Sequence, residues 1–214
     1  FLTLPAAAAL LVMSEPIIRL LLERGEFTAE STARVSSILA IYGLGLPAFV
    51  LIKAFIPGFF AREDTKTPMI YAAVSVVINV AMALTLFPIL AEAGIATAEV
   101  TAGWVNATLL FATLLWRGHW GRDIPLLTRI PRLFLSAAIM AFALYHAIDW
   151  AAPYLAPHAP FQVQALAVFG LILLSMVLYF ALAFATGGAS FGMIRRNVKR
   201  GARTNGTPPD QEAP

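Results

Sequence analysis

Long apolar runs, separated by short polar segments, make up most of this chain. A membrane-spanning helix needs about 20 mostly apolar residues. Strand-like alternation is absent over any useful length, and helices satisfy their own backbone amides, as lipid requires. We therefore expect an all-α, polytopic membrane protein with about six transmembrane helices. The expected spans are residues 1–22, 33–60, 68–90, 94–116, 130–151 and 162–186.

The polar residues at the connections favour caps and turns. Thr28 can cap the second helix, and residues 91–94 predict a tight hairpin between the third and fourth. Thr67 can cap the third helix, with Pro68 at its first position, where a missing amide does no harm. The prolines before the sixth helix are expected to break the chain: Pro153, Pro157 and Pro160.

Composition and charge support a membrane protein and set its orientation. Hydrophobic residues make up 59% of the 214 residues and charged residues 13%, with a net charge of +3. A soluble domain is about 45–50% apolar and about 25% charged, so a soluble enzyme or a nucleic-acid-binding module fits poorly. Residues 61–67, 117–132 and 195–214 hold eleven of the fifteen basic residues. Because cytoplasmic loops are rich in Lys and Arg, this predicts that both ends of the chain lie in the cytoplasm.

Enzyme-like signals are weak. The chain has no cysteine, so it has no disulfide or thiol nucleophile, and its three histidines lack metal-ligand spacing. Residues 43–48 match a G-x-G-x-x-A pattern but lie within an apolar run and follow no strand. We interpret Gly43, Gly45 and Pro47 as a hinge, or as a packing kink without motion.

Polar residues within the apolar runs are costly in lipid, which makes them functional candidates. Lys53, Asn79, Glu99 and Asn106 are of this kind. Asn79 and Glu99 stand on the two arms of the expected hairpin, where they can approach each other and form a polar path or a cation site. The alternatives are that Lys53 snorkels to the interface, that the asparagines bond neighbouring helices, and that Glu99 lies near the outer interface.

The turn over residues 61–68 is the densest polar feature between helices. Arg62, Asp64 and Lys66 place three charges within it. Asp64 can accept hydrogen bonds from nearby backbone amides, or pair with Arg62 or Lys66. Capping explains Thr67 and Pro68 but does not explain why so many charges gather there.

An ordered series of motifs makes the sequence recognisable. It consists of residues 22–28 (LERGEFT), 42–50 (YGLGLPAFV), Lys53, 57–68 (PGFFAREDTKTP), 93–96 (AGIA) and 103–107 (GWVNA). This series resembles the MurJ (MviN) family of lipid II flippases, within the multidrug/oligosaccharidyl-lipid/polysaccharide exporter superfamily. The specific motifs cover residues 1–116, whereas residues 117–186 match mainly as hydrophobic helices.

The resemblance implies a domain organisation. The family has fourteen helices, in two six-helix lobes and an additional pair, and this chain resembles helices nine to fourteen, the C-terminal portion of a longer protein. Residues 1–116 are then the last four helices of the second lobe, and residues 117–132 a basic cytoplasmic loop. Residues 133–190 are the two additional helices. Residues 191–214 are a basic, disordered cytoplasmic tail, which anchors the topology or, alternatively, binds anionic lipid headgroups.

The resemblance also implies a function: transport of lipid II across the bacterial plasma (inner) membrane by alternating access, for cell-wall synthesis, with no bond chemistry. The implied partners are lipid II, membrane lipids and cell-wall synthesis proteins, with no nucleic acid. No cofactor is expected; an ion gradient or the membrane potential supplies the driving force. The alternatives are an exporter of another lipid-linked oligosaccharide or drug, and a non-transporting membrane scaffold.

The resemblance assigns roles to particular residues. The expected residues of the substrate path or gate are Lys53, Arg62, Asp64, Lys66, Thr67 and Pro68. The expected hinge is Gly43, Gly45 and Pro47. Asn79 matches a cation-ligand position of the family, whereas Glu99 stands where a hydroxyl residue is common. The candidate cation site of Asn79 and Glu99 is therefore a rearranged one. Ala83, one turn after Asn79, offers no side-chain oxygen.

Overall fold

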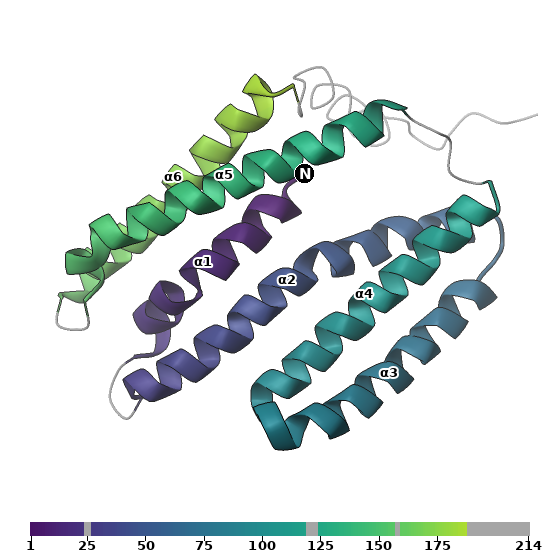
Figure 1. Ribbon diagram of the computed structural model, residues 1–214, viewed down its shortest axis with the longest axis horizontal. Coiled ribbons are helices and arrows are strands. Elements are labelled where there is room, and N and C mark those ends of the chain that lie inside the picture. The colour runs from purple at the N-terminus through teal and green to yellow at the C-terminus, as the bar shows by residue number, and fades with distance from the viewer. Residues whose placement is uncertain (24–26, 119–123, 157–158, 188–214) are drawn as a thin grey trace, which may run out of the picture.

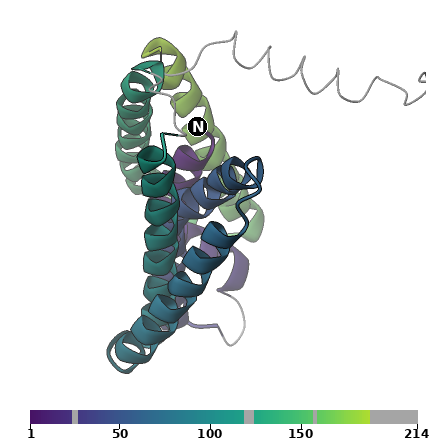
Figure 2. The ribbon, with the colours of Figure 1, turned by 90° about the vertical axis from the view of Figure 1, so that its right-hand side faces the viewer.

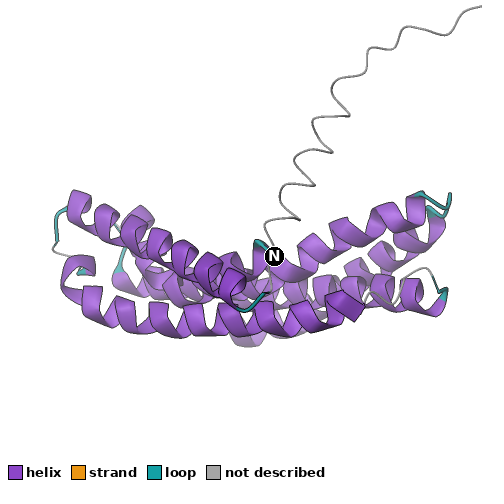
Figure 3. Ribbon diagram, turned by 90° about the horizontal axis from the view of Figure 1, so that it is seen from above, coloured by secondary structure: helices purple, strands orange, loops and turns teal. Residues whose placement is uncertain are grey.

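The computed structural model describes residues 1–23, 27–118, 124–156 and 159–187. Regular structure in these ranges is helical (Figures 1 and 3). The six helices are α1 (Thr3–Leu22), α2 (Ala29–Phe60), α3 (Lys66–Leu90), α4 (Glu92–Trp116), α5 (Ile124–Leu155) and α6 (Phe161–Ala185). Each contains a stretch long and apolar enough to cross a membrane. The expected all-α architecture is confirmed.

The helices lie side by side in an extended array (Figure 1). α3 packs on α4, α4 on α2, and α2 on α1. Figure 2 shows the close pairing of α3 and α4 from the side. α5 and α6 pack on each other and contact the other described helices through α1 alone. The array therefore has two parts joined at α1: α2 to α4, and the α5–α6 hairpin.

The packing contacts form separate apolar clusters along the array. One joins α1 to α5 and α6 through residues that include Met13, Leu144 and Leu171. Another joins α2 to α4 through Phe59 and Leu110, with Tyr71 of α3 packed against it. Large apolar side chains outside these clusters remain exposed, as a protein that faces lipid requires.

Two of the expected helix connections are confirmed. Thr28 caps α2, because its Oγ1 accepts a 3.3 Å hydrogen bond from the Ser31 amide. The α3–α4 hairpin is even tighter than expected, since Ala91 is its only residue between helices and has a φ of 50°. A Cβ at Gly94 would lie 2.7 Å from the Leu86 carbonyl oxygen, so glycine permits this close approach.

Three details of the expected caps and breaks are wrong. α3 begins at Lys66, and the Thr67 amide donates to Asp64, so Asp64 performs the capping role expected of Thr67. Pro68 is accordingly buried in the first turn and is not its first residue. Pro153 lies inside α5 and does not break the chain, because this helix continues to Leu155.

The basic segment expected as a loop over residues 117–132 is partly helical. α5 begins at Ile124, although its membrane-spanning part begins at Pro131. Residues 119–123 of that segment lie outside the described residues, as do Pro157 and the tail expected to be disordered, residues 191–214.

Candidate functional site

The turn between α2 and α3 centres on Asp64. Its Oδ1 accepts a 3.0 Å hydrogen bond from the Thr67 amide, and its Oδ2 accepts a 2.7 Å bond from the Thr67 hydroxyl. Arg117, at the end of α4, places Nη1 2.5 Å from the same Oδ2. The Thr67 hydrogen bonds, followed by the Arg117 contact, lower the pKa of Asp64 from its ordinary 3.8 to about 2. Asp64 is therefore a carboxylate at any physiological pH.

The ion-pair partner of Asp64 differs from the one the sequence favoured. Arg62 donates to the Gly58 carbonyl oxygen at 2.8 Å and so points back along α2. Arg117 instead makes the ion pair and also donates from Nη2 to the Thr67 hydroxyl at 3.2 Å. Sequence reasoning missed Arg117, because it lies 53 positions after Asp64 and follows a different helix.

Glu99 is paired across the α2–α4 interface. The Tyr42 hydroxyl donates a 2.8 Å hydrogen bond to the Glu99 carboxylate. The structure gives no hydrogen bond between Glu99 and Asn79, which lies half-buried on α3. Tyr42 belongs to the motif of residues 42–50, but no role was predicted for it. A tyrosine placed inside an apolar run was the available signal, since its hydroxyl needs a partner in lipid.

Four polar residues share one side of the α2–α4 pair. Tyr42 and Lys53 are about three helical turns apart on α2, and Glu99 and Asn106 about two turns apart on α4, so each pair lies on one helix face. Lys53 and Glu99 are exposed. The Asn106 Oδ1 is buried and has no hydrogen-bond partner. This polar face can contact a charged group entering from the side.

The opposite side of the same pair carries Leu44 and Trp104. Leu44 lies on it, about half a turn around α2 from Tyr42. The Trp104 indole donates from Nε1 to the Leu44 carbonyl oxygen at 3.1 Å, which fixes α4 against α2 on this side. The α2–α4 layer therefore has two different faces, one with Lys53 and Glu99 and one with Leu44 and Trp104.

The expected hinge residues lie within one unbroken helix, since α2 runs from Ala29 to Phe60. A Cβ at Gly43 would lie 3.1 Å from Leu10 Cβ, and a Cβ at Gly45 would lie 2.7 Å from Val100 Cγ2. The two glycines thus let α1 and α4 approach α2 closely from different sides. This contact accounts for the glycines through packing, whereas their role in motion stays a prediction.

Further polar contacts hold α3 against α4. The Tyr71 and Thr113 hydroxyls are 2.7 Å apart, and the Ser75 hydroxyl donates to the Ala102 carbonyl oxygen at 2.9 Å. Thr113 lies one turn before Arg117 and Tyr71 one turn after Thr67. These bonds continue the Asp64–Arg117 contact along the hairpin.

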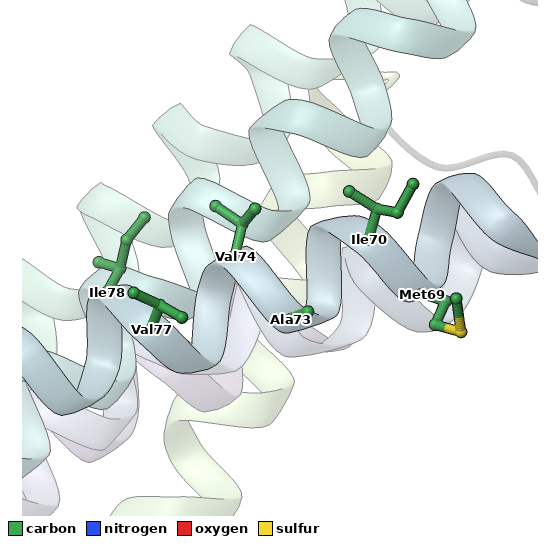
Figure 4. Close-up of a pocket in the computed structure, with 6 residues that line it drawn as sticks. All are labelled: Met69, Ile70, Ala73, Val74, Val77 and Ile78. Carbon is green, nitrogen blue, oxygen red and sulfur yellow. The ribbon is translucent and has the colours of Figure 1, made fainter.

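The far side of α3 forms an open apolar groove (Figure 4). Its lining residues all come from α3: Met69, Ile70, Ala73, Val74, Val77 and Ile78. The lining is aliphatic apart from the Met69 thioether. Such a surface can contact hydrocarbon and offers nothing to a charged headgroup.

A second charged cluster joins α1 to α2 at the other end of the molecule. The Arg19 side chain lies between Glu15 at 2.5 Å and Glu23 at 3.4 Å. The buried Thr32 hydroxyl donates to Glu23 at 2.8 Å. Among the described residues, neither this cluster nor any other group of three or more His, Asp or Glu side chains could hold a metal ion.

A sequence profile described as lipid II flippase MurJ matches residues 1–166, which include every candidate site residue described above. The chain belongs to the MurJ lipid II flippase family. Within the MurJ family, a probable lipid II flippase of Rhizobium meliloti is 73% identical over 202 residues, covering 94% of this chain and 38% of that relative. One from Rhizobium tropici is 52% identical over 200 residues, with the same two coverages.

More distant MurJ proteins match as well. The lipid II flippase MurJ of Burkholderia cenocepacia is 29% identical over 199 residues, covering 91% of this chain and 37% of its own length. The chain thus spans less than two-fifths of the MurJ relatives it matches. MurJ family membership, together with six helices that can span a membrane, identifies it as a multi-pass inner-membrane protein.

Proposed function

We propose that the protein to which this chain belongs moves lipid II from the inner to the outer face of the plasma membrane by alternating access. The match of the lipid II flippase profile to residues 1–166 carries this proposal. The relatives with the same name support it, because they align over 94% of the chain at up to 73% identity. The protein is then a transporter and makes or breaks no covalent bond.

The polar face of α2 and α4 forms part of the path of the lipid II headgroup. Lys53 is exposed on this face and offers an ammonium to the pyrophosphate. Tyr42 and Glu99 lie on the same face and offer groups that bond sugar hydroxyls and amides. The aliphatic groove along α3 has no polar side chain that could compete with this face for the headgroup.

The cytoplasmic turn acts as part of the gate, with Asp64 at its centre and Arg62, Lys66, Thr67 and Pro68 around it. The hydrogen bonds of Asp64 and its contact with Arg117 support this role, because they give the turn a defined geometry. Gly43, Gly45 and Pro47 form a bending point in α2. The absence of side chains at the two glycines and the missing amide hydrogen of Pro47 support such bending.

Asn79 and Glu99 form the candidate cation site through which an ion gradient can drive transport. Asn79 lies on α3 and Glu99 on α4, the two arms of the hairpin, and Glu99 supplies the negative charge. Tyr42 occupies one lone pair of the Glu99 carboxylate and leaves others for a cation. Membrane potential alone is the alternative driving force.

The chain enters the bilayer with both ends in the cytoplasm. This orientation places Asp64, Arg117 and the basic tail inside, and the α3–α4 hairpin at Ala91 outside. The concentration of Lys and Arg in residues 61–67, 117–132 and 195–214 supports it. Membrane lipids and cell-wall synthesis proteins are the expected partners.

The decisive experiment depletes the full-length protein in its host and measures lipid II accessible at the outer membrane face. A flippase predicts that outer-face lipid II collapses while total lipid II rises. Unchanged outer-face lipid II would overturn the proposal and favour an exporter of another lipid-linked oligosaccharide or drug. A scaffold predicts that lipid II still reaches the outer face while the recruitment of cell-wall enzymes fails.

A further inference from the structure

Three helix ends meet at one place in this structure. The α2–α3 turn is tied to α2, because the Asp64 amide donates to the Phe59 carbonyl oxygen at 3.2 Å. The turn is tied to α3, because Asp64 accepts from the amide and the hydroxyl of Thr67. The turn is also tied to α4, because Arg117 at the end of that helix contacts both the Asp64 carboxylate and the Thr67 hydroxyl.

The carboxylate oxygens of Asp64, the hydroxyl of Thr67 and both Nη atoms of Arg117 have hydrogen-bond partners within this cluster. Asp64 Oδ1 accepts the Thr67 amide, and Oδ2 accepts both the Thr67 hydroxyl and Arg117 Nη1. The Thr67 hydroxyl donates to Asp64 and accepts from Arg117 Nη2. Arg117 therefore contacts two acceptors from one planar group, which a lysine ammonium cannot reproduce with the same geometry.

Apolar contacts one turn away from the cluster join the same three helices. Phe59 of α2 is buried against Leu110 and Leu114 of α4, with Tyr71 of α3 packed beside them. The Tyr71 hydroxyl in turn bonds Thr113. The three helices are thus joined at this end by a polar cluster and an apolar cluster one turn apart.

We propose that Arg117 is a positioning residue that locks the α2–α3 turn to the end of α4, so that the cytoplasmic ends of α2, α3 and α4 move as one body. Arg117 acts through Asp64 and Thr67 and needs no contact with the cargo. The consequence of this lock for transport rests on the proposed function. The cargo then gains access from the cytoplasm along the edges of this three-helix body and not between its helices.

The test measures backbone hydrogen exchange in the full-length protein, reconstituted in lipid nanodiscs, with and without Arg117→Gln. We expect exchange of the amides of residues 61–67 to become about two- to fivefold faster, the range that partly exposed ion pairs produce. Exchange in α1, α5 and α6 should not change. Arg117→Lys keeps the charge but loses the two-acceptor geometry, so its effect should be intermediate.

The matched control is Arg34→Gln. Arg34 is also an exposed arginine in an ion pair, 2.6 Å from Glu30, but it lies at the start of α2, far along the helix from the turn. This variant should leave residues 61–67 at the wild-type exchange rate. Equal exchange in the wild type, Arg117→Gln and Arg34→Gln would overturn the proposal.

A double-mutant cycle separates a specific pair from a general loss of stability. Asp64→Asn and Arg117→Gln should each speed exchange of the turn, and their combination should add little to the larger single effect. Fully additive effects would show that Arg117 does not act through Asp64 and would overturn the proposal. If the Arg117→Gln protein fails to insert into the membrane, the same comparison is made with Arg117→Lys.

Lipid II at the outer face is measured for the same variants. If the protein is the flippase, Arg117→Gln should slow the appearance of outer-face lipid II by about the same two- to fivefold. If depletion of the wild type leaves outer-face lipid II unchanged, the proposed function fails, whereas faster exchange in Arg117→Gln would still support the positioning role. Faster exchange with normal flipping would limit Arg117 to local structure and overturn its role in transport.

Discussion

The hydroxyl of Tyr42 on α2 donates a 2.8 Å hydrogen bond to the carboxylate of Glu99 on α4, across 57 positions of sequence. Both residues lie within helices that can span the membrane. A carboxylate within an apolar run is costly, and a hydroxyl donor offsets part of that cost. The bond therefore joins two helices through the one acidic side chain of the polar face.

Replacing Tyr42 with Phe should destabilise the full-length protein by about 1 kcal/mol, because the Glu99 carboxylate loses its protein donor. The measurement is thermal unfolding in detergent, together with outer-face lipid II. Tyr154→Phe is the control, since Tyr154 is exposed and near the end of α5. Equal melting temperatures for both variants would show that the Tyr42 bond contributes nothing to stability.

The contribution of Asp64 to stability should depend on pH in one direction. Its pKa in the folded protein is about 2, below its ordinary 3.8. A lowered pKa means that the contribution is complete above about pH 4 and is lost as the pH falls from there towards 2. The stability difference between wild type and Asp64→Asn should therefore be constant at neutral and mildly acidic pH and shrink below about pH 4. A difference that already shrinks between about pH 7 and pH 5 would contradict this assignment.

Adding one methyl group at Gly45 should be unfavourable. A Cβ there would lie 2.7 Å from Val100 Cγ2 and 2.9 Å from the Phe49 ring. We expect Gly45→Ala to lower the free energy of unfolding by about 1–3 kcal/mol, because α2 and α4 must separate slightly. Gly170→Ala in α6 is the control: its Cβ meets nothing within 4 Å, and alanine favours helix by up to about 1 kcal/mol. Thermal unfolding of the two variants should shift in opposite directions.

Thr32 should matter more than an ordinary threonine on a membrane helix. Its hydroxyl is buried and donates to Glu23, which also receives Arg19. Thr32→Val should cost about 1–3 kcal/mol of stability, because Glu23 loses its shorter hydrogen bond and keeps only the 3.4 Å contact with Arg19. The exposed Thr108 bonds only the carbonyl of Trp104 on its own helix, so Thr108→Val should have little effect on the melting temperature. Similar losses in both variants would argue against a role for the Glu23 cluster.

The helices of this protein could be predicted from the sequence because the signal is local. An apolar run of suitable length defines a span without reference to any other part of the chain. The same holds for the Thr28 cap and for the hairpin at Ala91, where the interacting groups lie within a few residues. The bond between Asp64 and the Thr67 amide was also within reach, since Asp64 was expected to accept from nearby amides.

The long-range partners could not be predicted in the same way. Asp64 had two cations nearby in sequence, Arg62 and Lys66, yet it pairs with Arg117 because the end of α4 packs beside the turn. Glu99 had Asn79 opposite it on the hairpin, yet it bonds Tyr42 because α4 also packs against α2. Both choices depend on which faces of the helices meet, and helix periodicity alone does not fix that.

The single residue between α3 and α4 has a consequence for how the protein is made. With Ala91 alone linking them, the two helices have no intervening loop that could cross the membrane separately. The contact of Gly94 with Leu86 beside the turn is close in sequence, and such contacts form early. We therefore expect the pair to enter the bilayer as a preformed hairpin during synthesis. The connection at Ala91 then leaves almost no segment outside the bilayer for a protease or an antibody to recognise.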